Sequence, residues 1–170
     1  MGPARREHVE RVATLVGWWA DAMKTPPADR ERWLRAVYLH DALRDAPDTL
    51  LKSLTDDRWL SPALLHGPAA AEYAARHGER DRGVLDAVRF HSVGYAGWDR
   101  VGQMLYLGDY LEPGRKFRDE ERAALATLVP ADPRAVLKEV AAERLHWIVA
   151  SGWPLVAETV EFWNALAHAS

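Results

Sequence analysis

Residues 33–43, WLRAVYLHDAL, decide the fold class of this chain. Their inward-facing positions recur at intervals of three and four residues, the spacing of one face of an α-helix. These positions are Trp33, Ala36, Val37, His40 and Leu43. The pattern predicts a helix over about residues 27–45, beginning at Pro27, because proline is tolerated in the first turn of a helix. One imidazole therefore lies on an otherwise apolar face.

Helical patterns continue in both directions from this stretch. We expect helices over 6–23, within 46–62, from Gly67-Pro68 to Gly78, from the cap Asp81 to His91, over 98–109, from Asp132-Pro133 to about 150, and from there to about 168. No run alternates with the two-residue period of a strand. The sequence predicts an all-α fold, a single helical bundle of seven to nine helices over residues 1–170, in which 123–170 complete the core.

Composition limits the function classes. The chain has 170 residues, 48% of them hydrophobic, and a net charge of −3, which excludes disorder and the basic excess that duplex nucleic acid or an anionic membrane selects. No segment approaches the ~18 consecutive apolar residues of a membrane span, so we expect a soluble, cytoplasmic protein. With no cysteine, disulfides, thiolate metal sites and thiol nucleophiles are excluded. Any metal must bind to histidines and carboxylates.

Ionisable residues occupy positions where the helical pattern requires apolar ones. His91 follows Val84 by seven residues and Asp109 follows Leu105 by four, so both share the inward face with His40 in its own helix. A single histidine on such a face is usually a hydrogen-bonded core residue, but several together favour a metal or a charged partner. In the pair His40-Asp41 the side chains lie ~100° apart around a helix, within reach of one ion.

The ordered series of histidines and aspartates resembles the HD-domain phosphohydrolases, in particular their YqeK-like branch of symmetrical diadenosine-tetraphosphate hydrolases. The motifs that carry the resemblance are REH at 6–8, AVYLHD at 36–41, LHGPAAA at 65–71, HSVG at 91–94 and LYLGDYLEPGR at 105–115. The resemblance therefore covers residues 6–122, which we call the motif core. Two positions depart from the pattern: Arg44 replaces a common lysine, and Gly108 replaces a common alanine.

The resemblance implies a centre for two divalent metal ions. Its ligands would be His8, His40, Asp41, His66, His91 and Asp109. Asp41 would bridge the ions, with His8, His40 and Asp109 on one and His66 and His91 on the other. These donors suit iron, manganese, nickel, cobalt or zinc, and the resemblance favours iron.

The expected reaction is hydrolysis of a phosphoanhydride, in which a hydroxide between two metal ions attacks phosphorus. This reaction suggests roles for further residues. Arg115 would bind the phosphates, with Arg44 and Lys116 as additional contacts, although Lys116 and Arg118 also fit a solvated charge run with 119–122. Glu112 would orient a ligand histidine or Arg115, or would be a surface acid. Tyr95 and Trp98 would stack on adenine or pack in the core. His77, His146 and His168 are excluded from the site.

The sequence also contains more tryptophan than is usual. We expect Trp18, Trp33, Trp147 and Trp163 to line the core or a groove. The set Trp147, Trp153 and Trp163 near the end of the chain is a candidate cover for the nucleotide pocket or a contact in a homodimer.

Three functions follow. The preferred one is a metal-dependent hydrolase that cleaves the dinucleoside polyphosphate diadenosine tetraphosphate symmetrically to two ADP. The second keeps the fold and the metals but acts on a nucleoside monophosphate, a deoxynucleotide or another small phosphoester. The third is a non-catalytic nucleotide sensor in which a metal has a structural role.

Overall fold

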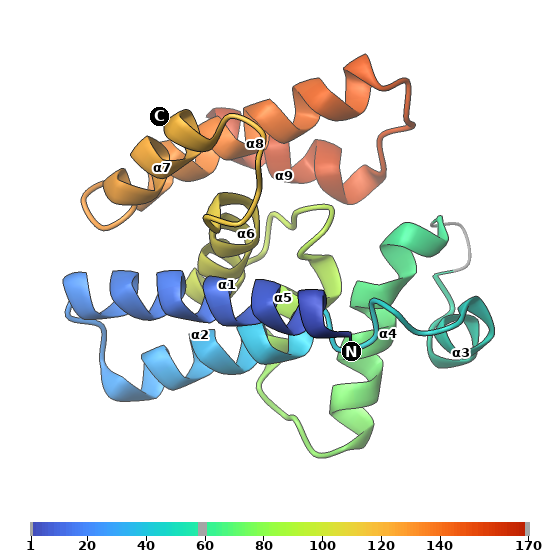
Figure 1. Ribbon diagram of the computed structural model, residues 1–170. Helices are drawn as coiled ribbons and strands as arrows, with labels where there is room; N and C mark the ends of the chain where they lie inside the picture. The colour runs from blue at the N-terminus through green and yellow to red at the C-terminus, as the bar shows by residue number, and fades with distance from the viewer. Residues whose placement is uncertain (1, 58–60, 169–170) are drawn as a thin grey trace.

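The computed structural model describes residues 2–57 and 61–168, and these residues form helices and no strand, which confirms the predicted all-α class (Figure 1). Nine helices lie within the described ranges, at the upper end of the expected number. They are α1 (Pro3–Ala22), α2 (Pro27–His40), α3 (Asp48–Leu54), α4 (Pro62–Arg76), α5 (Arg82–Phe90), α6 (Arg100–Leu111), α7 (Asp119–Leu128), α8 (Pro133–Ala150) and α9 (Ala157–His168).

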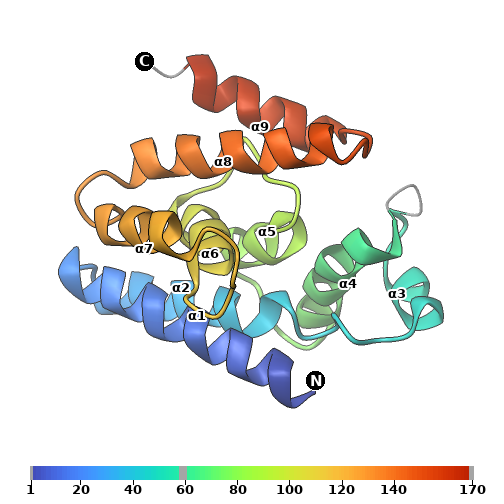
Figure 2. The same ribbon diagram turned by 45° about the horizontal axis from the view of Figure 1, so that its top comes forward.

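Helix α6 is at the centre of the arrangement. It contacts α1, α2, α5, α7 and α8, and nine of its residues are buried. In both ribbon views α6 lies between α1 and α2 on one side and α8 and α9 on the other (Figures 1 and 2), and Figure 2 shows α5 beside α6 in the same position. Helices α3 and α4 pack together beside this stack. A helix that is covered on all sides has to be apolar on all sides, which makes the buried Asp109 of α6 an exception that needs an explanation.

The departure at Gly108 has a packing reason. A Cβ atom at this position would lie 2.6 Å from Cγ2 of Val16 and 3.2 Å from Cγ1 of Val12. The absence of a side chain therefore lets α6 approach α1 closely, and this approach brings Asp109 of α6 near His8 of α1.

We expect Gly108→Ala to lower the free energy of unfolding by about 1 kcal/mol. The added methyl group overpacks the contact with α1, which costs about 1–3 kcal/mol, and this cost exceeds the ~1 kcal/mol that alanine gains over glycine in helix propensity. Adding Val16→Ala should recover part of the loss. Urea denaturation of the single and double variants measures this coupling. Gly17→Ala in α1 is the matched control, since its Cβ would meet only Arg30 Nη2 at 3.5 Å. A Gly108→Ala variant that gains as much stability as this control would contradict the close approach.

Two helix boundaries differ from the predictions. Helix α2 ends at His40, so that Asp41 is the first residue beyond the helix, with φ −105° and ψ 14°, and residues 41–45 form turns. Helix α4 begins at Pro62 and contains Pro68, although Pro68 cannot donate a hydrogen bond to the carbonyl of Leu64. Packing of α4 against α3 and α5 compensates for that bond. The short helix expected within 46–62 is α3, and residues 58–60 lie outside the described residues.

Other local predictions are confirmed. The carboxylate of Asp81 accepts a hydrogen bond from the backbone N–H of Val84 and caps α5, and that of Asp132 accepts from Ala135 and caps α8. No helix was predicted at α7, whose signal is the acidic run Asp119–Glu121 in its first turn. That residues 1–170 form a single domain stays a prediction.

The expectation for tryptophan holds for two residues and is wrong for two. Trp33 is buried and Trp163 packs, half-buried, against the core. Trp18 and Trp147 are 46% and 64% exposed. On α1 the residue that completes the inward face is Trp19, which is fully buried and donates a hydrogen bond from Nε1 to the carbonyl of Ala126. An error of one position moves a side chain ~100° around a helix.

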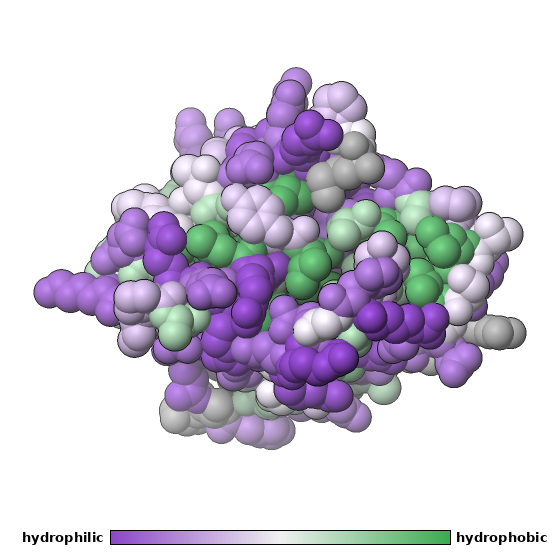
Figure 3. All heavy atoms as spheres, turned by 90° about the horizontal axis from the view of Figure 1, so that it is seen from below, coloured by the Kyte–Doolittle hydropathy of each residue, from purple (hydrophilic) through white to green (hydrophobic). Residues whose placement is uncertain are grey.

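The surface is mixed in polarity. On the face that lies at the bottom of Figure 1, hydrophilic residues surround separate apolar patches (Figure 3). None of the helices in the described part of the chain is long and apolar enough to span a membrane.

Candidate metal centre

The structure brings all six predicted ligands together at the centre of the bundle. His8 comes from α1, His40 is the last residue of α2, Asp41 follows it, His66 lies in α4, His91 follows α5, and Asp109 lies in α6. Each of these residues is at most 8% exposed. Five helices therefore supply the centre, and two of its residues lie just beyond the ends of theirs. The close contact at Gly67, where a Cβ would lie 2.8 Å from the carbonyl oxygen of Arg89, holds α4 against α5.

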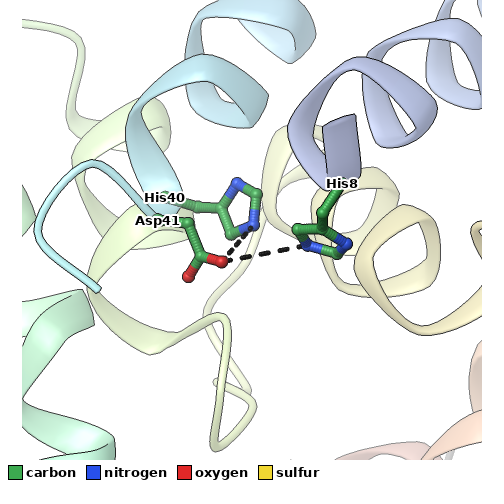
Figure 4. A group of neighbouring side chains, drawn as sticks. All are labelled: His8, His40 and Asp41. Carbon is green, nitrogen blue, oxygen red and sulfur yellow. Dashed lines mark ion pairs between the residues drawn. The ribbon is translucent and has the colours of Figure 1, made fainter. Parts of the chain in front are cut away.

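Asp41 occupies the middle of this group. Its Oδ1 lies 3.3 Å from Nε2 of His66 and 3.8 Å from Nε2 of His91. Its Oδ2 lies 3.7 Å from Nε2 of His40 and 3.8 Å from Nε2 of His8, and Figure 4 shows both rings turned toward it. The ligand atoms form two clusters that share Asp41, namely His8–His40–Asp41 and Asp41–His66–His91. Asp109 adjoins the first, with Oδ1 3.2 Å from Nε2 of His8.

The outer nitrogen of every ring is held by a hydrogen-bond acceptor. Nδ1 donates to the carbonyl oxygen three residues earlier in His40 (Val37, 2.6 Å), His66 (Ala63, 2.8 Å) and His91 (Val88, 2.8 Å). In His8 it donates to Oε1 of Glu112 at 3.1 Å. A neutral imidazole that donates from Nδ1 has its lone pair on Nε2. All four lone pairs therefore point to the centre.

This arrangement of lone pairs fits a cation. Among the described residues, Nε2 of His8 and Nε2 of His40 are buried and carry no hydrogen bond. Nε2 of His66 and Nε2 of His91 lie only 2.9 Å apart, a distance at which two lone pairs repel unless a proton or a metal ion lies between them. Buried polar atoms without partners are rare in folded proteins. The residues present thus fit divalent metal ions, which bind imidazole and carboxylate together.

The electrostatics of the centre suit metal ligands. Burial lowers the pKa of His91 to about 3, assisted by the neighbouring His66 and His40, and burial likewise lowers the pKa of His40. Burial opposes ionisation of Asp41, but its contact with His66 outweighs burial and holds the pKa of this carboxyl well below its usual range. The pKa of Asp109 is depressed in the same way by His8 and Arg115. At neutral pH these groups are therefore in the deprotonated state that binds metal.

His8 behaves differently from the other histidines. Burial disfavours its charged form, but its contacts with Asp109 and then Glu112 outweigh burial and raise its pKa. His8 is therefore protonated in a larger fraction of molecules than His40 or His91, and a metal ion that binds to it has to displace that proton.

Three guanidinium groups surround the carboxylates. Nη1 of Arg5 lies 2.7 Å from Oδ2 of Asp41. Nη2 of Arg115 lies 2.7 Å from Oδ1 of Asp109, and Nε of Arg115 donates to the carbonyl oxygen of the same residue. Arg144 of α8 approaches Oδ2 of Asp109 at 3.8 Å. The sequence did not point to Arg5 or Arg144; the spacing of three residues between Arg5 and His8 could have indicated the first, and no signal indicates the second.

The predicted substrate contacts have different surroundings. Arg44 donates to the carbonyl of Ala63 and lies 3.0 Å from Nδ1 of His66, so it is placed behind that ring and not on its Asp41 side. Lys116 is exposed. Tyr95 stacks on Phe90 with ring centroids 4.5 Å apart, whereas Trp98 is buried in the core. The roles of these side chains toward a substrate stay predictions.

The prediction that Arg122 belongs to a solvated charge run is wrong. It is 2% exposed, and its guanidinium donates to the backbone carbonyls of Tyr110, Glu112, Arg115 and Phe117. Burial lowers the pKa of this group. Arg122 thereby shapes the segment 110–117, which carries both Glu112 and Arg115.

Glu112 is buried, which excludes the alternative that it is a surface acid. Besides the hydrogen bond from His8, its Oε2 accepts hydrogen bonds from Nε of Arg11 and from the backbone N–H of Gly114. A carboxylate behind a ligand histidine fixes the ring and raises its basicity. The predicted orienting role is therefore matched by a contact with His8.

We expect Glu112→Gln to weaken metal binding by about 10- to 100-fold, the usual effect of replacing such an orienting carboxylate. Competition with a fluorescent chelator measures the affinity. Glu10→Gln on the exposed side of α1 is a suitable control. Unchanged affinity in Glu112→Gln would show that His8 needs no carboxylate behind it to bind metal.

The fold and this centre together define a class: helical proteins that bind divalent metal through buried histidines and aspartates. The sequence matches the HD domain model over residues 5–129, and the chain belongs to the HD domain family. It is an enzyme of the hydrolase class. The match ends before α8, so α8 and α9 lie outside it.

Individual relatives agree with this assignment. The sequence is 27% identical over 154 residues to the symmetrical bis(5'-nucleosyl)-tetraphosphatase of Halalkalibacterium halodurans, covering 86% of this chain and 81% of that protein. It is 26% identical over 153 residues to the enzyme of the same name from Bacillus subtilis, covering 84% and 80%. These relatives confirm the resemblance noted in the sequence.

A solved structure resembles the whole chain. It is described as a predicted HD superfamily hydrolase involved in NAD metabolism from Clostridium acetobutylicum, and the two superpose with a TM-score of 0.87 and 23% identity over 100% of this chain and 92% of that one. At this identity the likeness concerns the fold, and it extends through α8 and α9.

Proposed function

We propose that the chain hydrolyses diadenosine tetraphosphate symmetrically to two ADP at a centre for two divalent ions. The observation that carries the proposal is the carboxylate of Asp41, each of whose oxygens faces two imidazoles and which belongs to both ligand clusters. The substrate is supported by the names of the two relatives that match most of the chain. Iron is the proposed metal because of the family resemblance, although the same donors suit manganese, cobalt, nickel or zinc.

In this reaction water attacks one of the two inner phosphorus atoms. The bond from that phosphorus to the central bridging oxygen breaks, the second ADP leaves with that oxygen, and one proton of the water is released. Divalent ions bound at such a centre provide a nucleophile from water at neutral pH and neutralise charge on the phosphate. We assign the ligand roles to His8, His40, Asp41, His66, His91 and Asp109.

The protein groups around the ligands have complementary tasks. Arg115, whose side chain is 38% exposed, can turn a guanidinium N–H toward a phosphate oxygen while its Nε remains on the backbone of Asp109. Glu112 holds the ring of His8. Burial of the centre excludes bulk water, which strengthens the interaction of each charge with the phosphate chain.

The products of the reaction test the proposal. Protein loaded with iron under anaerobic conditions, or with manganese, is incubated with diadenosine tetraphosphate, and the nucleotides are separated by ion-exchange chromatography. We expect ADP alone. Equal amounts of ATP and AMP would refute symmetrical cleavage, and faster turnover of a nucleoside monophosphate would favour the second function. Tight nucleotide binding by metal-loaded protein without turnover would favour the sensor.

A further inference from the structure

A cavity of about 80 Å³ lies beside the metal centre, between α4, α5 and the first turn of α9. Leu64 and Ser92 line it, and they stand next to the ligand positions: Leu64 precedes His66 by two residues, and Ser92 directly follows His91. Oγ of Ser92 lies 3.2 Å from Nε2 of His91. A group in this cavity would therefore be adjacent to the His66–His91 side of the centre.

One wall of the cavity is aromatic. Phe90 lines the cavity, and its ring stacks on that of Tyr95 with an interplanar angle of 21°. The guanidinium of Arg89 lies 5.6 Å from the Phe90 ring centroid and forms an ion pair with Asp57. These contacts hold Phe90 in place, and its ring gives the cavity an apolar wall.

Among the described residues that line this cavity, Glu158 has a buried oxygen without a hydrogen-bond partner. It lines the cavity from the first turn of α9, and its Oε2 is buried with no hydrogen bond among the described residues. A buried carboxylate oxygen only accepts hydrogen bonds, and leaving it unpaired is unfavourable. The missing partner is therefore an N–H or O–H donor.

We propose that this cavity binds the adenine of the nucleotide, with Phe90 against the ring and Glu158 accepting a hydrogen bond from the 6-amino group. This inference rests on the proposed function, because a nucleotide whose phosphates lie at the metal centre has to place its base close by. Adenine supplies both features that the cavity requires, a flat apolar face and an edge N–H donor. Specificity for the base then comes from α9, outside the part of the chain that matches the HD domain model.

A comparison of ADP with purine riboside 5′-diphosphate tests the inference, since that base has hydrogen in place of the 6-amino group and no N–H donor on this edge. Calorimetric titration of manganese-loaded protein should show ADP binding at least about tenfold more tightly than purine riboside 5′-diphosphate, the effect of leaving a buried acceptor unpaired. In Glu158→Gln the preference should fall to within about twofold, because an amide either accepts or donates. Glu161→Gln, on the exposed side of the same helix, should keep the preference.

Equal affinity of the wild-type protein for ADP and purine riboside 5′-diphosphate would overturn the inference, and so would an unchanged preference in Glu158→Gln. The wild-type comparison needs no variant, so it holds even if Glu158→Gln folds poorly. The outcome is separable from that of the proposed function. Symmetrical cleavage without a base preference refutes only the adenine site, whereas a preference that depends on Glu158 in a protein that leaves diadenosine tetraphosphate intact refutes only the reaction.

Discussion

Asp41→Asn should lower the rate of diadenosine tetraphosphate hydrolysis by more than about 100-fold. Replacing a carboxylate that only orients a ligand reduces metal affinity or activity by about 10- to 100-fold, and Asp41 is expected to exceed that range because its two oxygens face all four imidazoles. Asparagine has the same shape but no charge, and its amide nitrogen donates where a ligand has to accept. Initial rates and bound metal per chain are both measured.

The control for this variant is Asp48→Asn, which neutralises an exposed aspartate of α3 and should change neither quantity. The two clusters make a second expectation possible. Because Asp41 belongs to both, Asp41→Asn should reduce occupancy of both sites together. Retention of two bound ions with more than about a tenth of the activity would contradict the shared role of Asp41.

Arg122→Met should lower the free energy of unfolding by about 3 kcal/mol or more, because each buried carbonyl that loses its donor costs about 1–3 kcal/mol. Methionine has a similar length but cannot donate, so the carbonyl groups of Tyr110, Glu112, Arg115 and Phe117 lose their donor. Unpaired buried carbonyls are costly. The same variant should reduce activity, because the backbone that carries Arg115 is released.

Urea denaturation of the metal-free protein measures this effect without a contribution from metal binding. Lys116→Met removes a cation from the same segment at an exposed position and is the matched control, for which we expect a change within about 0.5 kcal/mol. Equal stability of the two variants would mean that segment 110–117 keeps its conformation without Arg122.

Three of the six candidate ligands could be found in the sequence because each of the three interrupts an apolar helical face. His40, His91 and Asp109 stand where the spacing requires a core side chain, and all three are buried. Their meeting at one point could not be obtained from spacing, because it depends on how five helices cross. The family resemblance supplied that step. The close approaches at Gly67 and Gly108 explain it physically.

The residues that support the ligands were harder to find. Arg122 looks like a member of a mixed charge run, because a sequence does not reveal that its guanidinium turns inward to backbone carbonyls. Arg144 and Glu158 come from helices far along the chain from the motifs, and only the tertiary fold brings them to the centre or to the cavity beside it. Local patterns predict which face of a helix is buried but not which distant side chain covers it.

Helix boundaries show the same limit. The apolar spacing of α2 continues to Leu43, yet the helix ends at His40 and the chain turns at Asp41. This turn places the carboxylate of Asp41 between the rings of His8, His40, His66 and His91. If the helix had continued, its axis would have fixed the direction of the Asp41 side chain instead. At Pro68 the predicted helix was too short. The sequence placed the start of the helix at Gly67-Pro68, but α4 begins at Pro62, because contacts with neighbouring helices outweigh one lost backbone hydrogen bond.

The most direct test of the account is the rate of ADP formation from diadenosine tetraphosphate as a function of metal ions bound per chain. Metal-free protein is titrated with manganese, and bound metal and initial rate are determined at each step. A centre with a shared Asp41 predicts that activity reaches its maximum at two bound ions. Full activity at one ion per chain, or activity independent of bound metal, would contradict it.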